Sequence, residues 1–281
     1  EPVLHKMAVR HLVRATRHHT GVLTLTMANP SNRNALSTEM MGTLCSMLAA
    51  DRADGLVGGA RVVVISGDGG CFSAGHDLRE IEAARNDSEA LLRIFASCGE
   101  LMKAVREHPV PIIAAVDGPA HAAGCELAAS ADIVVADEGT ATFATPGVRM
   151  GLFCHTPAVA LVKALGGGAA GARRAALMLY SGTPVSASAA ASMGLVHELA
   201  PAGNVAAVAH DLAAAIASAP PAVVRDGKRV LTESSRALSR EEAYRLARQA
   251  MVRGAMSGDA AEGTRAFFEK RPPVWPGRCT S

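Results

Sequence analysis

The sequence predicts an α/β protein, because short β-branched runs alternate with longer helical patterns over about its first 200 residues. Two continuous apolar runs, 62–65 and 112–116, have the length of strands that are buried on both faces of a sheet. Beyond Pro157 the patterns are mostly helical and rich in alanine. We therefore expect an α/β core over residues 1–205 and a helical C-terminal module over residues 206–281.

The individual elements follow from local patterns. Ser37 is a candidate N-cap for the first helix, since its hydroxyl can accept a hydrogen bond from the first turn. Strands are expected at 11–16, 22–27, 62–65, 112–116 and 133–136. Helices are expected at 37–53, 88–106, 158–165, 169–180, 186–193, 205–218, 221–237, 240–254 and 258–270.

Charge and hydropathy exclude several classes of protein. The 28 Lys and Arg residues nearly balance the 26 Asp and Glu residues, so the net charge of +2 creates no strong field for nucleic acid or an anionic membrane. Apolar runs such as 110–116 are far shorter than the roughly 20 residues that cross a bilayer. The first 20 residues carry no apolar block of the signal-peptide kind. We expect a soluble, non-secreted protein with neither nucleic acid nor membrane as a partner.

The cysteines indicate a reducing compartment. No C-x-x-C pair occurs, which argues against both a disulfide framework and a zinc site. We expect free thiols in a cytosolic or organelle-matrix protein. The six cysteines are at positions 45, 71, 98, 125, 154 and 279.

Two short motifs have competing interpretations. The glycine-rich segment 166–171 matches G-x-G-x-x-G, but it follows a helical pattern where a dinucleotide site requires a strand, so a turn between helices is favoured. The segment 71–75 differs from a nucleophile elbow at its first position, Cys71, and Ser73 is interpreted as a turn residue.

Two other segments lie where chemistry occurs in α/β folds, directly after the buried strands. They are Phe72-Ser73-Ala74-Gly75-His76-Asp77 and the segment 118–128, Gly-Pro-Ala-His-Ala-Ala-Gly-Cys-Glu-Leu-Ala. Their glycines and alanines allow the backbone to approach a ligand closely. We expect the functional site at these strand ends.

These two segments and five others, in the same order along nearly the whole chain, resemble the crotonase, or enoyl-CoA hydratase/isomerase, superfamily. The resemblance implies a crotonase (ClpP-like) spiral fold of ββα units with a helical C-terminal trimerisation module. It also implies an acyl-CoA substrate, no metal or redox cofactor, a homotrimer or dimer of trimers, and a bacterial cytoplasmic or mitochondrial matrix location. The five further segments are 32–37, 131–133, 143–147, 194–196 and 266–271.

The resemblance also implies a catalytic arrangement. The backbone N–H groups of His76 and Ala123 would hold the thioester oxygen, and fixed donors of this kind stabilise the negative charge that develops there. Glu126 would be the acid or base, although a carboxylate in the first turn of a helix also has a purely structural use. The expected substrate-binding and CoA-binding positions are Arg33, Ala35, Ala74, Gly75, His76, Asp77, Leu78, Ala123, Gly124, Gly147 and Lys270, the last contributed by a neighbouring subunit.

The sequence departs from the hydratase pattern at the second catalytic glutamate, whose position falls on Gly147. Hydration is therefore expected to be inefficient, and Gly147→Glu to increase it. His155 falls where some relatives carry a catalytic carboxylate, and it is either a partner of Glu126 or a polar residue at the pocket rim. A second hypothesis is a non-catalytic acyl-CoA-binding protein with the same fold.

Overall fold

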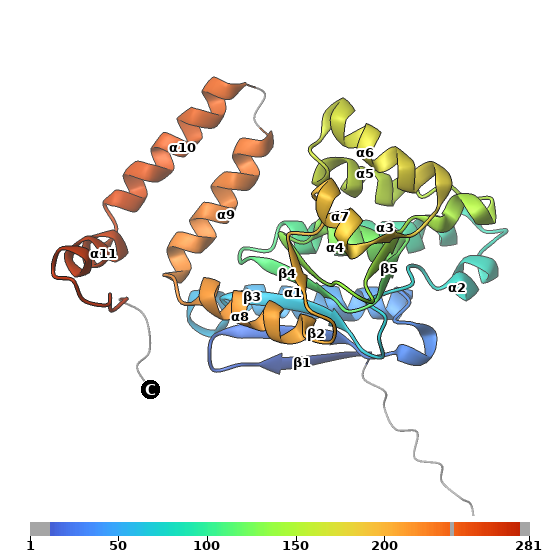
Figure 1. The fold of residues 1–281 in the computed structure, drawn as a ribbon, viewed down its shortest axis with the longest axis horizontal. Helices are drawn as coiled ribbons and strands as arrows, with labels where there is room; N and C mark the ends of the chain where they lie inside the picture. Colours follow the sequence, from blue (N-terminus) through green and yellow to red (C-terminus); the bar gives the residue numbers. More distant parts are fainter. Residues whose placement is uncertain (1–11, 237–238, 276–281) are drawn as a thin grey trace, which may run out of the picture.

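The structure is a computed structural model that describes residues 12–236 and 239–275 (Figure 1). Within these residues, the centre is a six-stranded sheet in the order β1-β2-β3-β4-β6-β9. β1 runs antiparallel to β2, and each of the other neighbouring pairs is parallel. The strands are β1 (Val13–Arg17), β2 (Val22–Met27), β3 (Val62–Gly67), β4 (Ile112–Val116), β6 (Ile133–Asp137) and β9 (Glu198–Ala200).

Alternate residues of the central strands face two separate cores. Val63 and Ile65 of β3 belong to the larger core, which also contains residues of α1 and α3, while Val62 and Val64 belong to a smaller core under α8. A strand that is apolar on both faces has no polar alternation, and this explains the continuous apolar runs in the sequence.

A second sheet in the described chain has the order β5-β7-β8 and stacks beside the helices above the central sheet (Figure 1). Its strands are β5 (Pro119–His121), β7 (Thr142–Ala144) and β8 (Val185–Ser186). The sequence analysis missed these three strands and β9, because strands of two or three residues are too short to show alternation.

Most helices agree closely with the predicted ranges. α2 was missed, and α4, the helix that carries Glu126, was expected only from the family resemblance. Ser37 caps α1 as expected, accepting a hydrogen bond of 3.1 Å from the backbone N–H of Met40. Residue 11 of the first predicted strand and residue 237 of one predicted helix lie outside the described residues. The helices are α1 (Thr38–Gly58), α2 (Leu78–Ala83), α3 (Ser88–Arg106), α4 (Ala123–Ser130), α5 (His155–Ala164), α6 (Gly168–Ser181), α7 (Ala187–Met193), α8 (Val205–Ala217), α9 (Pro221–Arg236), α10 (Arg240–Ala255) and α11 (Gly258–Phe268).

The glycine-rich segment 166–171 is a turn between helices, as predicted. Gly166, Gly167 and Gly168 have positive φ angles and connect α5 to α6. A Cβ atom at Gly171 would lie 2.1 Å from the carbonyl oxygen of Val162, so this glycine lets α6 pack directly against α5. These glycines serve backbone geometry between two helices.

The C-terminal helices divide into two groups. α8 packs on the central sheet through Val205, Ala209 and Ala213, whereas α9, α10 and α11 extend away from it (Figure 1). Lys228 attaches α9 to the core, since its Nζ donates to the carbonyl oxygen of Val110 at 2.9 Å and to the Asp132 carboxylate at 2.6 Å. The predicted boundary between the α/β core and the C-terminal module, after residue 205, stays a prediction. α8, which follows this boundary, packs on the central sheet of the core.

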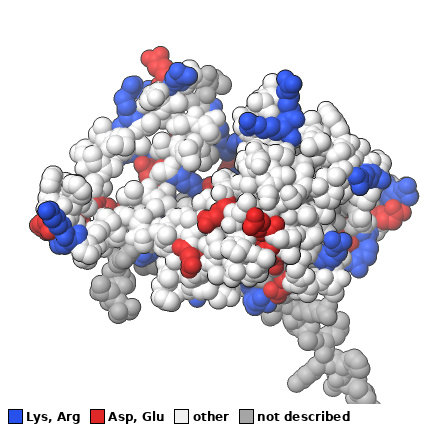
Figure 2. Space-filling view, viewed as in Figure 1, with Lys and Arg blue, Asp and Glu red and all other residues white. Residues whose placement is uncertain are grey.

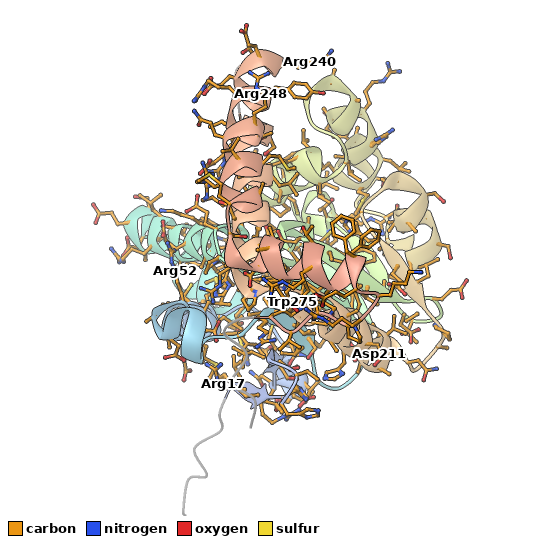
Figure 3. The ribbon with its side chains drawn as sticks, turned by 90° about the vertical axis from the view of Figure 1, so that its left-hand side faces the viewer. Arg17, Arg52, Asp211, Arg240, Arg248 and Trp275 are labelled. Carbon is orange, nitrogen blue, oxygen red and sulfur yellow. The ribbon has the colours of Figure 1, made fainter. Side chains whose placement is uncertain are left out.

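The three outer helices expose large apolar side chains. Met251 of α10, Met256 directly after α10, and Phe267 and Phe268 of α11 are each more than 70% exposed. On the face that Figure 2 shows, uncharged surface extends over much of these helices. Trp275 is half-buried and donates a hydrogen bond of 3.1 Å to the carbonyl oxygen of Ser218. In Figure 3 it lies well below Arg240, the first residue of α10.

Candidate active site

The segments that follow β3 and β4 lie side by side. Ser73 donates its backbone N–H to the carbonyl oxygen of Pro119 at 3.1 Å, and His121 donates to the carbonyl oxygen of Ser73 at 2.9 Å. A Cβ atom at Gly124 would lie 2.3 Å from the carbonyl oxygen of Ser73, so only glycine allows this approach. The two sequence segments expected at the site are therefore brought into direct backbone contact.

Gly75 packs against the turn that begins α4. Its φ of +95° is favourable only for glycine, and its N–H donates to the Ser73 hydroxyl at 3.2 Å. A Cβ atom at Gly75 would lie 2.8 Å from the Cβ of Ala122 and 3.1 Å from the backbone nitrogen of Ala123. The backbone of Gly75, the residue before His76, is therefore packed closely against the backbone nitrogen of Ala123.

Ala122 has an unusual backbone conformation at this position. Its φ of 49° and ψ of −120° lie in a region that residues with a side chain rarely adopt, and it is the residue immediately before α4. Such strain costs about 1–3 kcal/mol and is found mainly where function requires a particular backbone direction. The first N–H groups of α4 therefore point outward with the positive end of the helix dipole.

A cavity of about 770 Å³ opens in front of this backbone pair, with a largely apolar wall. It includes nine of the predicted site positions, namely Arg33, Ala35, Ala74, His76, Asp77, Leu78, Ala123, Gly147 and His155. The remaining lining residues are Ser31, Asn32, Arg79, Ile81, Phe95, Ala122, Pro146, Met150, Gly151, Leu152, Phe153, Cys154, Thr156 and Pro157.

Glu126 lies just behind the cavity wall. It is 4% exposed and is not one of the lining residues. Its Oε2 accepts a hydrogen bond of 2.9 Å from the hydroxyl of Thr156, and the Sγ of Cys98 lies 4.0 Å from the same oxygen. Burial raises the pKa of Glu126, while the Thr156 hydrogen bond and the Arg106 charge oppose this increase. The carboxyl group therefore faces α5 and α3, which is not the position of a helix cap.

The two predicted histidines differ in environment. His76 is half-buried, its ring packs edge-to-face on Phe95 at 5.4 Å, and burial lowers the pKa of its imidazole. His155 is exposed at the first position of α5, with its ring 5.0 Å from that of Phe153. The hydrogen bond to Glu126 comes from Thr156, the residue after His155.

Gly147 is closely packed by the loop that follows it. A Cβ atom there would lie 2.8 Å from the Sγ of Cys154 and 2.8 Å from the carbonyl oxygen of Leu152. The Leu152 N–H also donates to the carbonyl oxygen of Gly147 at 3.0 Å, which fixes this loop. A glutamate at 147 does not simply add a second acid, because any side chain there displaces the backbone at 152. The gain in hydration expected from Gly147→Glu stays a prediction.

The expected CoA-binding residues line one side of the cavity. Asp77 caps α2 and pairs with Arg79 at 2.9 Å, and it accepts a hydrogen bond from Asn32 at 2.8 Å. The Arg79 hydrogen bond is the largest cause that lowers the pKa of Asp77 to about 2. Arg33 has a left-handed backbone conformation with φ of 50° and presents a second cation to the cavity. Ala35 is buried and Leu78 is exposed.

Lys270 is not brought to this cavity within the chain. It follows α11, and Figure 1 shows α11 and α2 at opposite ends of the molecule. Its contribution from a neighbouring subunit stays a prediction.

The described residues offer neither a cluster of metal ligands nor a single helix that could span a membrane. They contain no group of three or more His, Cys, Asp or Glu side chains that could hold a metal ion. No single described helix is long and apolar enough to cross a membrane. Among the described helices, only α8 and α9 taken together have the length and apolar composition of such a span, and they are bent by 104° relative to each other. The five described cysteines are free thiols.

Sequence reasoning missed Thr156. Its contact with Glu126 joins residues that are 30 positions apart and depends on how α5 packs on α4. Nothing in the local pattern around Thr156 marks it as a partner of a buried carboxyl group.

The fold and the site define a member of the enoyl-CoA hydratase/isomerase family, whose sequence profile matches residues 17–278. The chain belongs to this family, and it has the crotonase fold that the sequence predicted. It is similar to mitochondrial enoyl-CoA hydratase domain-containing protein 3 of Rattus norvegicus, with 42% identity over 264 residues, 93% of this chain and 83% of that protein.

Solved structures of two relatives have the same fold as this chain. The crystal structure of human enoyl-CoA hydratase domain-containing protein 3 matches with a TM-score of 0.86 and 39% identity, covering 94% of this chain and 100% of that one. An enoyl-CoA hydratase from Mycobacterium smegmatis matches with a TM-score of 0.87 and 36% identity, covering 94% and 99% of the two chains.

Proposed function

We propose that this protein is an acyl-CoA enzyme of the hydratase/isomerase class that forms a thioester enolate. The backbone N–H groups of His76 and Ala123 hold the thioester oxygen, and Glu126 is the acid and base. The observation that supports the proposal is the close packing of Gly75, the residue before His76, against the backbone nitrogen of Ala123, since both His76 and Ala123 line the cavity.

The chemistry follows from this arrangement. When a proton leaves the α-carbon, its bonding electrons form a carbon–carbon double bond and the carbonyl electrons move to the oxygen. Two preorganised donors and the N-terminus of α4 stabilise that oxygen. The proton passes to Glu126, whose raised pKa suits a group that both accepts and returns a proton at neutral pH.

Efficient hydration needs a second group that activates water, and the cavity offers little for this role. Asp77 is the one carboxylate among the described lining residues, and it is committed to Asn32 and Arg79. We therefore propose that proton transfer at the α-carbon is retained and that addition of water is weak.

The cavity entrance suits the phosphates of CoA. Arg33 and Arg79 are among the residues that line the cavity, and each charge-assisted hydrogen bond from a guanidinium group to a phosphate contributes about 1.5–3 kcal/mol. We expect acyl-CoA thioesters to bind at least about tenfold more tightly than the corresponding free acids. Isothermal titration calorimetry measures both, and equal affinities would contradict the proposed CoA site.

Turnover is tested by proton exchange. A saturated acyl-CoA incubated with the protein in D₂O should exchange its α-protons, which NMR detects without any assumption about the final product. A panel of 2-enoyl, 3-enoyl and 3-hydroxyacyl-CoAs then separates isomerisation from hydration. Thioester binding without exchange on any substrate would contradict enolate formation.

That last outcome would favour a second candidate function, a non-catalytic acyl-CoA-binding protein. The observation in its favour is Gly147, where the side chain of the second glutamate is absent and the Cys154 thiol fills the adjacent space. The buried Glu126 argues against this function, because a carboxyl group without a role at this depth is unfavourable for folding.

We also propose that the protein assembles through its outer helices as a trimer or a dimer of trimers. The exposed Phe267 and Phe268 are anchors of the kind that interfaces bury, and Lys270 lies next to them. Trp275 is a weaker candidate anchor, since it is half-buried within its own chain and donates to the carbonyl oxygen of Ser218. Light scattering should give at least three times the 28.8 kDa of one chain. A monomer at micromolar concentration would contradict both the assembly and the role of Lys270 across it.

The location proposed for the protein is the bacterial cytoplasm or the mitochondrial matrix. The similarity to mitochondrial relatives supports the second of these.

A further inference from the structure

We propose that Glu126 exchanges protons with the acyl group through the hydroxyl of Thr156, which acts as a relay between the buried carboxyl group and the cavity. The proposal rests on the proposed function and adds a second residue to its proton-transfer path. Neither His155 nor a side chain at position 147 takes part in this proton-transfer path.

The Thr156 hydroxyl lies between the cavity and the Glu126 carboxyl group. Glu126 is 4% exposed and behind the cavity wall, whereas Thr156 is exposed and forms part of that wall. The Thr156 Oγ1 is 2.9 Å from the Glu126 Oε2, a normal distance for a hydroxyl that donates to a carboxylate. A substrate in the cavity therefore meets the hydroxyl before it can meet the carboxylate.

Both residues of the relay lie in the first turn of a helix, which holds their side chains in place. Glu126 is in the first turn of α4, three residues after the proposed oxyanion donor Ala123, and Thr156 is the second residue of α5. Because α4 and α5 pack together and Ala123 and Thr156 both line the cavity, a thioester held by the Ala123 N–H would have its α-carbon near the first turns of both helices. The hydroxyl is thus close to the atom whose proton moves.

The step balances without another reactant. The α-proton moves to the Thr156 oxygen while the hydroxyl proton moves to the Glu126 Oε2, so one proton leaves the substrate and one reaches the carboxylate. The electrons of the broken carbon–hydrogen bond remain in the enolate. The reverse transfer returns a proton to either end of the conjugated system.

Variants of Thr156 separate a relay from a structural contact. Thr156→Val keeps the side-chain shape and removes the hydroxyl, and we expect α-proton exchange to fall about 10²-fold or more. Thr156→Ser keeps the hydroxyl and should remain close to the wild-type rate. Thr156→Ala leaves room for a water molecule between Glu126 and the cavity, so its rate should lie between those of the valine and serine variants.

The pH profile supplies a second measurement. The titratable and charged groups around Glu126 are Cys98 and Arg106 from α3, Cys125 on α4 and Cys154 before α5. Burial and then Glu126 raise the pKa of Cys98 to about 12, so this thiol stays protonated through the assay range. Loss of the Thr156 hydrogen bond raises the pKa of Glu126 further, and the acid limb of the rate profile should move to higher pH in Thr156→Val alone.

Thr145 provides a matched control. It is buried two residues before Gly147, and its hydroxyl has no hydrogen-bond partner within the described part of the chain. Thr145→Val should leave the exchange rate and the pH profile unchanged, because no described contact is lost.

The outcomes are distinct. Exchange by Thr156→Val within a few fold of the wild type, with an unshifted profile, would overturn the relay and leave the proposed function intact. Equal loss in Thr156→Val and Thr156→Ser, with acyl-CoA affinity retained, would also overturn it, since the hydroxyl would not matter. A wild-type protein that binds acyl-CoA without exchange would overturn the proposed function and the relay together.

Discussion

Gly75→Ala is expected to lower turnover by about 10²- to 10³-fold, the loss typical of a misplaced oxyanion donor. The added Cβ would lie 2.8 Å from the Cβ of Ala122 and 2.9 Å from the carbonyl oxygen of His121. Since one of these contacts is backbone, the 75–76 segment must move away from the turn before α4. The two N–H groups of the proposed oxyanion hole, those of His76 and Ala123, would then be moved apart.

The same variant should also be less stable, because alanine at a φ of +95° is strained by about 1–2 kcal/mol. Gly70→Ala is the control for that strain. Gly70 has a φ of +67° in the same loop, but a Cβ atom there meets nothing within 4 Å. We expect Gly70→Ala to lose stability and keep its turnover, as measured by urea unfolding and by α-proton exchange. Equal turnover of the two variants would show that the approach of Gly75 to Ala123 is not required.

The fold was largely predictable because its main elements carry local signals. The strands at 62–65 and 112–116 were found because each is buried on both faces, and α3 was predicted with its observed bounds, 88–106. α2 was missed although Asp77 caps it, since six residues give too little periodicity. The boundary between the α/β core and the helical C-terminal module was less predictable. Nothing in the alanine-rich pattern distinguishes α8, which packs on the central sheet, from α9, which does not.

The site was predictable to the extent that it is made of backbone. The glycines and alanines after β3 and β4 indicated close approach to a ligand, and the structure brings those two segments together. The interpretation of Gly147 was incomplete, because the sequence shows the lost side chain but not the path of the loop at Leu152. Thr156 was out of reach for the same reason, since its partner is fixed by helix packing and not by spacing.

Glu126→Gln is expected to lower α-proton exchange by about 10²- to 10⁴-fold, the usual contribution of a general acid or base. The substitution keeps the size of the side chain and its contact with Thr156 while removing the titratable group. Glu89→Gln is the matched control, because the side chain of Glu89 is 86% exposed on α3 and is not one of the lining residues. Its turnover should equal that of the wild type.

The same substitution should make the protein more stable at neutral pH. Burial raises the pKa of Glu126, so the folded state binds its proton more tightly than the unfolded state does. The ionised carboxylate therefore destabilises the fold at high pH, and this cost disappears as the pH falls to that of an ordinary carboxyl group, about 4. In urea unfolding, the stability gain of Glu126→Gln over the wild type should be largest near about pH 8 and should vanish near about pH 4. A variant that is inactive yet more stable indicates a carboxyl group retained for chemistry, whereas a variant that is active, or less stable at every pH, would indicate that Glu126 is a structural residue of α4.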